Sequence, residues 1–153
     1  MAIDRIDWHS GGDFPEDLPH ENGGTHIGIY LAWILHNNLH GDIHRDNEHS
    51  IKAVNQVIRR ERTGRDFLIE QCDEKFWEED LNEEGKSFTE YYYSNKDTAK
   101  FIEDYSNYLD NNEETLYHVE NTWNNYDKIA PVISRRFKEW KKSNQIKPWW
   151  KFW

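Results

Sequence analysis

The sequence contains a single cysteine, four prolines and no long run of apolar residues. Because Cys72 has no second cysteine to pair with, a disulfide within the chain is excluded, which favours the reducing cytoplasm. No segment approaches the roughly 18 consecutive apolar residues of a transmembrane helix, and the first residues lack the apolar stretch of a secretion signal. We therefore expect a cytoplasmic protein that does not insert into a membrane.

Basic residues are also scarce, since 19 Lys and Arg stand against 29 Asp and Glu for a formal net charge of -10. This balance argues against nucleic acid as the main partner, which would require a positively charged surface. The charge is also uneven, because residues 128–153 contain eight basic residues and only one acid, Glu139. Such an uneven charge distribution predicts a charged protein partner. We expect the basic end to dock on the chain's own acidic part.

Aromatic residues are abundant, with eight Trp, eight Tyr and seven Phe in 153 residues. They offset the low hydrophobic content, because each can bury about 150–250 Å², so we expect a folded chain rather than a disordered one. A chain of this length is most simply one domain. We predict a single domain with an irregular N-terminal loop (1–24), a helical body (25–142) and a Trp-rich basic tail (143–153).

Helical periodicity dominates the body and predicts a mainly α, compact fold, with a short β element near the N-terminus or in mid-chain. The most hydrophobic helix is expected to begin at the N-cap Thr25 and to stop at Gly41. A second helix is expected over about 48–62, ended by Gly64, with the inner stripe Ile51, Val54, Val57 and Ile58. In the last helix Pro131 lies near the first turn, and the apolar face comprises Ile129, Val132, Ile133, Arg136, Phe137 and Trp140.

Two histidine-containing segments are candidates for chemistry. His36, His40 and His44 have the His-x3-His spacing of metal ligands, but Gly41 interrupts the helix and no acid completes the set. The N-terminal segment places Asp7, His9, Asp13, Glu16, Asp17, His20 and Glu21 close in sequence, a mixture suited to general acid–base catalysis. No recognisable Ser or Cys nucleophile or phosphate-binding loop accompanies it. We therefore predict no catalytic residues, no metal ligands and no cofactor.

Acidic residues gather in two stretches that also carry aromatic side chains. Residues 70–90 contain nine acids and two bases, and residues 103–120 contain six acids and neither Lys nor Arg. Such runs are often only solvated surface, but with interleaved aromatics they are typical of a protein-binding surface. The predicted aromatic anchors are Trp77, Tyr92, Tyr105 and Tyr108. The predicted charged contacts are Glu78, Glu79, Asp80, Glu83, Glu84, Asp110, Glu113 and Glu114.

Several motifs spread along the chain resemble a family of small uncharacterised bacterial proteins. They are Asp7-Trp8-His9-x-Gly-Gly-Asp-Phe-Pro-x-Asp-Leu-Pro, Thr25-His26-Ile27-Gly28, Leu31-Ala32-Trp33, Thr63-Gly64-Arg65-Asp66-Phe67-Leu68, Asp73-Glu74-Lys75-Phe76-Trp77, Leu116-Tyr117-His118-Val119-Glu120 and Ile129-Ala130-Pro131-Val132. Such proteins look like the immunity proteins encoded beside polymorphic toxins. The resemblance implies a protein that binds and neutralises a cognate toxin domain, which we expect to be basic, by covering its active site with the acidic surface. The alternatives are a metal-dependent hydrolase using the N-terminal His/Asp cluster and an adaptor or chaperone-like binding protein.

Overall fold

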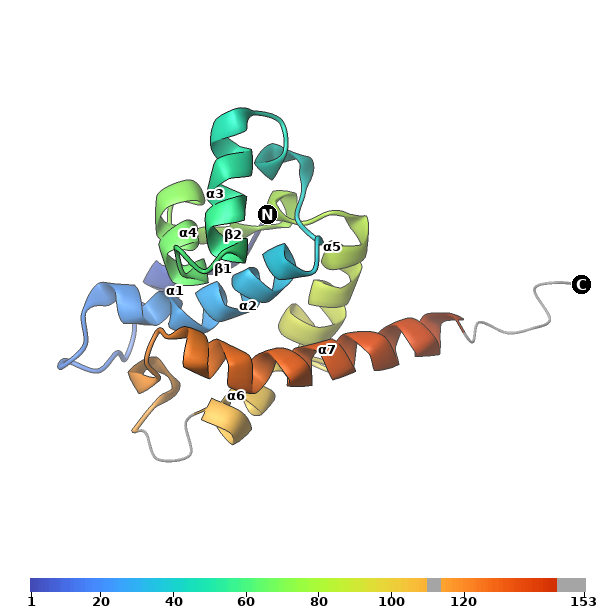
Figure 1. The fold of residues 1–153 in the computed structure, drawn as a ribbon. Helices are drawn as coiled ribbons and strands as arrows, with labels where there is room; N and C mark the ends of the chain where they lie inside the picture. Colours follow the sequence, from blue (N-terminus) through green and yellow to red (C-terminus); the bar gives the residue numbers. More distant parts are fainter. Residues whose placement is uncertain (110–113, 146–153) are drawn as a thin grey trace, which may run out of the picture.

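The computed structural model describes residues 1–109 and 114–145, which form a mainly helical fold with one small sheet (Figure 1). The predicted fold class is confirmed. The α-helices in the described part are α1 (Ile6–Ser10), α2 (Thr25–His36), α3 (Glu48–Ile58), α4 (Gly64–Gln71), α5 (Glu83–Thr89), α6 (Phe101–Leu109) and α7 (Trp123–Gln145). Short 3-10 helices are η1 (His20–Gly24), η2 (Asp42–His44), η3 (Glu78–Asp80) and η5 (Leu116–His118), and η4 (Glu90–Ser94) is a π-helical turn.

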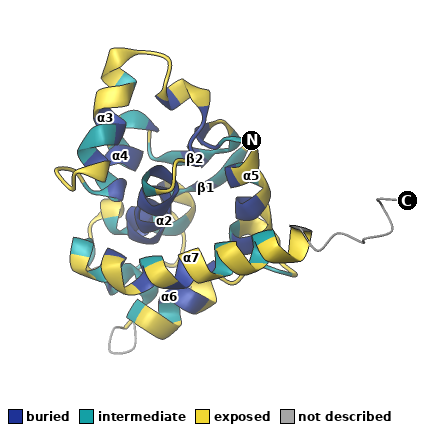
Figure 2. Cartoon of the chain, turned by 45° about the vertical axis from the view of Figure 1, so that its right-hand side comes forward, coloured by how far each residue is buried: buried dark blue, intermediate teal, exposed yellow. Residues whose placement is uncertain are grey.

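Helix α2 forms the centre of the core, and every residue from Thr25 to Leu35 is buried (Figure 2). A helix that is apolar all round is stable only when other elements cover all its faces. The helix ends at His36 rather than at Gly41 as predicted. Asn38 adopts a left-handed conformation with φ 59, and the Leu39 N–H donates to the Ile34 carbonyl at 3.0 Å. This pattern is a Schellman motif in which asparagine takes the usual place of glycine.

Helices α2 and α4 cross at two glycines, Gly28 and Gly64. A Cβ atom added to Gly64 would lie 1.8 Å from the Gly28 carbonyl oxygen, so only glycine allows the two backbones to approach this closely. Thr63 begins α4 through a capping box with Asp66. The prediction that Gly64 ends the preceding helix is therefore wrong. Helix α3 ends at Ile58, two residues before the left-handed Arg60 with φ 64.

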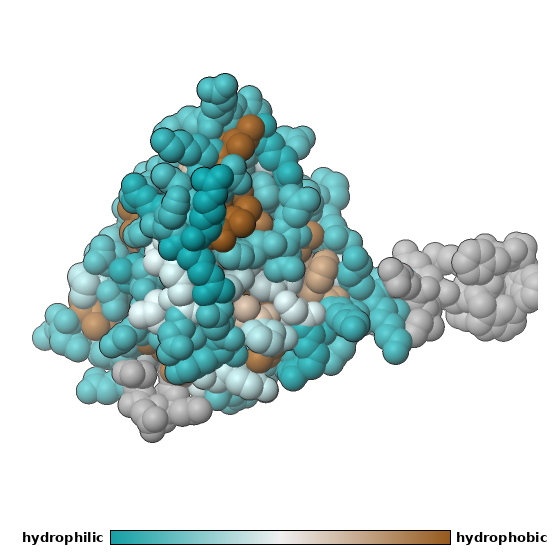
Figure 3. All heavy atoms as spheres, in the orientation of Figure 1, coloured by the Kyte–Doolittle hydropathy of each residue, from teal (hydrophilic) through white to brown (hydrophobic). Residues whose placement is uncertain are grey.

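The exposed face of α3 corrects a second prediction. Val54 and Val57 are buried as expected, but Ile51 and Ile58 are 45% and 42% exposed. Ala53 completes the buried stripe in their place. In Figure 3 small hydrophobic patches over α3 interrupt an otherwise hydrophilic surface.

The N-terminal segment is more regular than predicted. Strand β1 (Ala2–Arg5) pairs antiparallel with β2 (Lys75–Trp77), with Asp4 opposite Phe76, and α1 and η1 follow. These elements are short, and the strand forms only because a partner far along the chain completes its hydrogen bonds. The segment is therefore anchored in the core at Asp4, Ile6, Gly23 and Gly24, which are buried, and only residues 11–19 form the predicted irregular loop.

Helix α7 packs against α6 through the apolar face that the sequence predicts, with Ile129, Val132 and Ile133 buried. Pro131 lies inside this helix rather than in its first turn, because the helix already begins at Trp123. Arg136 forms a bidentate pair with the buried Asp104, at 3.0 and 2.9 Å, and Lys141 lies 3.4 Å from Glu84 of α5. The basic helix thus docks on the acidic part of the chain, as predicted.

The Trp-rich tail predicted at 143–153 falls largely outside the described residues. Within the described ranges, no helix combines the length and the apolar character that crossing a membrane requires.

Candidate functional site

Only part of the predicted acidic surface is grouped on one side of the structure. We name as the acidic face the four carboxylates Glu78, Glu79, Glu83 and Glu84, which η3 and the start of α5 present to solvent. The side chains of Glu79 and Glu83 are 60% and 95% exposed, whereas Glu78 is half-buried. The segment is held from beneath by the buried side chains of Phe76, Leu81 and Phe88. Two lysines partly neutralise the negative charge of this face: Lys86 lies 3.7 Å from Glu83, and Lys141 lies beside Glu84.

Three predicted contact residues belong to the core instead. Tyr92 and Tyr105 are 0% exposed and Asp80 is 2% exposed, so none of them can contact a partner on the surface. Tyr92 donates a hydrogen bond to Asp104 at 2.6 Å, and an Asp80 oxygen accepts from the Trp77 backbone N–H at 2.7 Å. Residues on one face of a helix have the same spacing whether that face packs in the core or contacts a partner. The sequence therefore could not distinguish a buried face from a binding face.

The remaining predicted contacts are scattered. Trp77 is half-buried beside the acidic face, and Tyr108 is 44% exposed on α6. Glu114, 84% exposed, lies beside His118 at 3.8 Å. Figures 1 and 2 both place α6 at the bottom of the molecule, away from α5. Asp110 and Glu113 lie outside the described residues.

A different group of side chains converges beneath the N-terminal segment. We name as the His–Asp centre Asp4 of β1, His9 of α1 and His26 of α2. His9 Nε2 lies 2.8 Å from Asp4 Oδ1, and His26 Nε2 lies 3.4 Å from Asp4 Oδ2. The two imidazole rings meet edge to face, with centroids 4.5 Å apart. One ligand-type atom from each residue lies within 4.8 Å of the others.

Two tyrosines hold the outer side of this centre. The Tyr93 hydroxyl donates to Asp4 Oδ2 at 2.6 Å, and the Tyr117 hydroxyl lies 2.7 Å from His9 Nδ1. Although burial acts in the opposite direction, the two adjacent imidazoles hold the pKa of Asp4 well below its usual range. Burial lowers the pKa of His26, an effect that the neighbouring carboxylate opposes. The centre therefore combines an ionised carboxylate with a neutral, buried imidazole.

A second buried cluster, which we name the closed cluster, comprises His44, Cys72 and Asp80. His44 Nε2 lies 2.8 Å from Asp80 Oδ1, and the Cys72 thiol lies 3.7 Å from the same oxygen. Burial, followed by the Asp80 charge, raises the pKa of Cys72 well above its usual value. In the metal-free protein the thiol therefore stays protonated and acts as a weak donor to Asp80.

The histidine series identified in the sequence does not form one site. His36 Nε2 lies 3.2 Å from the Val57 carbonyl oxygen, His40 is buried where its backbone bridges to Leu81, and His44 belongs to the closed cluster.

The N-terminal cluster also separates, because only His9 turns inward. His20 bonds to Ser10 and Glu74, and Asp17 lies 3.1 Å from His118. His20 instead lines an open hollow of about 260 Å³ together with Arg5, Asp7, Asp73, Glu74 and Lys75. Charges around this rim pair with one another, as Arg5 does with Asp7 at 2.7 Å and Lys75 with Asp73 at 3.2 Å.

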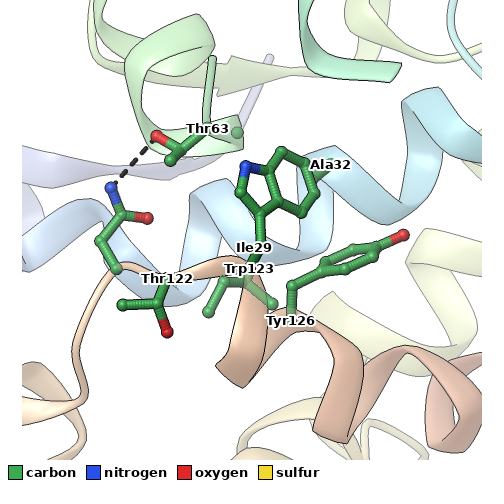
Figure 4. A pocket seen from close by; sticks show the side chains of 8 residues that line it. Ile29, Ala32, Thr63, Thr122, Trp123 and Tyr126 are labelled. Carbon is green, nitrogen blue, oxygen red and sulfur yellow. Dashed lines mark hydrogen bonds between the residues drawn. The ribbon is translucent and has the colours of Figure 1, made fainter. Parts of the chain in front are cut away.

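A small pocket lies where α7 begins, between α2 and the start of α4 (Figure 4). It is lined by Trp123 and Tyr126 on one side and by Ile29 and Ala32 on the other, and Asn121 closes its edge by donating to Thr63 at 3.1 Å. Its volume of about 10 Å³ is room for about one water molecule. This pocket is too small for a substrate.

These features define a helical domain with an acidic face and a buried His–Asp centre. Residues 2–119 match the family described as a domain of unknown function, DUF7832, and the chain belongs to that family. No curated protein and no solved structure matches the chain. The matched range includes the acidic face and the whole His–Asp centre.

Sequence reasoning missed four residues of the centre and its surroundings: Asp4, His26, Tyr93 and Tyr117. His26 and Tyr117 do occur in motifs that carry the family resemblance. The available signal was a polar histidine at the start of the most apolar helix, a place where burial requires a partner.

Proposed function

We propose that the protein is an immunity-type binding protein that neutralises a basic toxin domain through the acidic face. The observation that carries this proposal is the cluster of three exposed carboxylates and the half-buried Glu78 within seven residues, on a segment fixed to the core by Phe76, Leu81 and Phe88. A rigid group of like charges steers a basic partner and raises its association rate. The half-buried Trp77 at its edge is the remaining candidate for an aromatic anchor.

The docking of α7 supports the same proposal. Because Arg136 and Lys141 pair with acids of the same chain, the basic helix is not a free arm for nucleic acid. Glu78 and Glu79 keep their charge without a Lys or Arg partner among the described residues. The negative potential of this surface is thus left to an external basic group.

His20, the outer histidine of the N-terminal His/Asp cluster, does not support the hydrolase alternative as a general base. Both imidazole nitrogens of His20 are engaged, one with Ser10 and one with Glu74. A general base needs a free lone pair that is aimed at a substrate. The charged residues of the neighbouring hollow are also paired with one another.

The test begins with the gene next to the one that encodes this chain. A large secreted protein with a toxic C-terminal domain is expected there, and co-expression with this chain should restore growth of bacteria that produce the toxic domain. The double variant Glu79→Lys/Glu83→Lys should slow association at least about tenfold at low salt, because steering depends on these charges.

The double variant Glu48→Lys/Glu61→Lys is the matched control, since it makes the same charge change at two exposed sites, one at each end of α3. It should leave association within about twofold of the wild type. Unchanged association of the double variant would exclude the acidic face. Growth inhibition that this chain does not relieve would exclude the immunity function itself.

A further inference from the structure

His26 is the least satisfied polar side chain of the His–Asp centre. It is 1% exposed, and neither ring nitrogen makes a hydrogen bond within the described part of the chain. A buried donor or acceptor left without a partner costs about 1–3 kcal/mol. A histidine in this position, aimed at an ionised carboxylate, indicates that a ligand supplies the missing interaction.

The atoms around His26 have the chemistry of a cation site. One nitrogen from each imidazole and the Asp4 carboxylate form the donor set, and a ligand atom from each residue lies within 4.8 Å of the others. Zinc binds such ligands at about 2.0–2.2 Å, which places neighbouring ligand atoms about 3–3.5 Å apart. His9 Nε2 lies 2.8 Å from Asp4 Oδ1 and His26 Nε2 lies 3.4 Å from Asp4 Oδ2, so each imidazole is already close to this range from one oxygen of the same carboxylate.

The tyrosines complete the arrangement expected around metal ligands. A ligating histidine usually has its second ring nitrogen fixed by an outer hydrogen bond, and ligating carboxylates are also bonded from outside. Tyr117 occupies the first position, 2.7 Å from His9 Nδ1, and Tyr93 the second, 2.6 Å from Asp4 Oδ2. A hydroxyl can either accept or donate at Nδ1, so Tyr117 suits His9 with and without a metal on Nε2.

We propose that Asp4, His9 and His26 bind one divalent transition-metal ion, with zinc as the best match. Imidazole ligands disfavour Mg²⁺ and Ca²⁺, which take oxygen ligands almost exclusively. The side chain of His9 is 22% exposed, which gives the ion a route from solvent. A bound ion ties β1 and α1 to the central helix α2, so metal binding stabilises the N-terminal segment. The inference does not depend on the proposed toxin partner.

The test uses the full chain, purified without a histidine tag and treated with EDTA, and CoCl2 followed by ZnCl2 as probes. Wild-type protein should take up one Co²⁺ per chain, with visible absorption that Zn²⁺ abolishes and with a higher melting temperature. His26→Leu should weaken binding at least about a hundredfold, and Tyr117→Phe about tenfold, the usual range for an outer-shell partner.

His26→Leu replaces an imidazole that makes no hydrogen bond with the described residues by an apolar side chain, so the metal-free variant should remain folded by circular dichroism. His9→Gln, at the more exposed position, provides the same readout if His26→Leu does not fold. His20→Gln is the matched control, because it removes an exposed histidine that also lies beside a carboxylate, Glu74. It should bind Co²⁺ as the wild type does.

Two results would overturn the proposal. One is the absence of any Co²⁺ or Zn²⁺ uptake and of any shift in melting temperature for the wild type. The other is equal uptake by the wild type and by His26→Leu and His9→Gln, which would show adventitious binding to surface histidines.

Discussion

The His–Asp centre and the closed cluster are built from similar residue types but are completed differently. Each pairs a buried aspartate with a buried histidine, and each is drawn from elements far apart in sequence. In the closed cluster both Asp80 oxygens receive protein donors, from His44 and Cys72 on one side and from the Trp77 backbone N–H on the other. In the His–Asp centre, His26 makes no hydrogen bond with the described residues.

The difference separates a structural role from a ligand-binding role. A buried polar network stabilises a fold when all its members are satisfied, and a partly satisfied one needs a further partner. Because both Asp80 oxygens already have protein donors, the closed cluster holds η2, the end of α4 and η3 together. The His–Asp centre has a second imidazole in place of the thiol, and the nitrogens of His26 make no hydrogen bond with the described residues, which is why the cation is assigned to it.

The largest expected effect comes from breaking the closed cluster. Asp80→Ala should lower the free energy of unfolding by about 3–5 kcal/mol, because it leaves His44 and the Trp77 N–H buried without a partner. Urea denaturation of the EDTA-treated protein measures it. Glu79→Ala, at the exposed neighbouring position, is the control and should change stability by no more than about 0.5 kcal/mol. Equal effects of the two changes would mean that Asp80 is not a structural clamp.

Acid should destabilise the region around the closed cluster. Burial, with smaller contributions from the charges of Arg45 and His44, lowers the pKa of His40 to about 4, against about 6.5 in an unfolded chain. The unfolded state therefore binds the proton first, and stability falls as pH decreases from about 6.5 to about 4. The loss should amount to about 1–3 kcal/mol.

His40→Gln should flatten this part of the profile of unfolding free energy against pH, measured in EDTA. His49→Gln, at an exposed histidine in α3, is the control and should leave the slope as it is in the wild type. If the slope between pH 4 and 6.5 were the same in His40→Gln as in the wild type, His40 would not be its source.

Removing the thiol tests whether Cys72 is only a minor donor. Cys72→Ala should cost about 1 kcal/mol, since a thiol is a weak donor and Asp80 keeps its two stronger partners. Metal uptake should remain at one Co²⁺ per chain. Loss of Co²⁺ uptake in Cys72→Ala would show that the closed cluster, and not the His–Asp centre, binds the metal.

The smallest stability effect is expected at His26. In EDTA, His26→Leu should change the free energy of unfolding by less than about 1 kcal/mol in either direction, because loss of the 3.4 Å contact with Asp4 offsets removal of a buried imidazole without a hydrogen bond. With zinc in excess, the wild type should become more stable and the variant should not. A large loss of stability in EDTA would show that His26 is held by interactions other than a metal.

The sequence predicted the elements whose stability comes from long apolar stripes. The central helix, the apolar face of α7 and the docking of its basic residues were all predicted correctly. Boundaries were wrong where left-handed residues other than glycine end helices, as at Asn38 and Arg60. Gly64, which reads as a helix stop, instead allows α4 to cross α2.

The site was less predictable, because it depends on contacts between distant segments. Asp4, His26 and Tyr93 come from three parts of the chain, and no spacing rule brings them together. Tyr92 and Tyr105 have the pattern of surface anchors but are buried, since helical spacing does not say which side of a helix faces the core. Asp80 was predicted as a charged contact of the acidic surface, but its hydrogen bonds with His44 and Cys72 make it a structural residue.

The most direct test of the central claim is a crystal structure of zinc-treated protein with anomalous diffraction collected at the zinc absorption edge. An anomalous peak about 2.0–2.2 Å from His9, His26 and Asp4, with none at His44, Cys72 and Asp80, is the predicted result. An empty His–Asp centre in protein that contains zinc elsewhere, or a peak at the closed cluster, would contradict it.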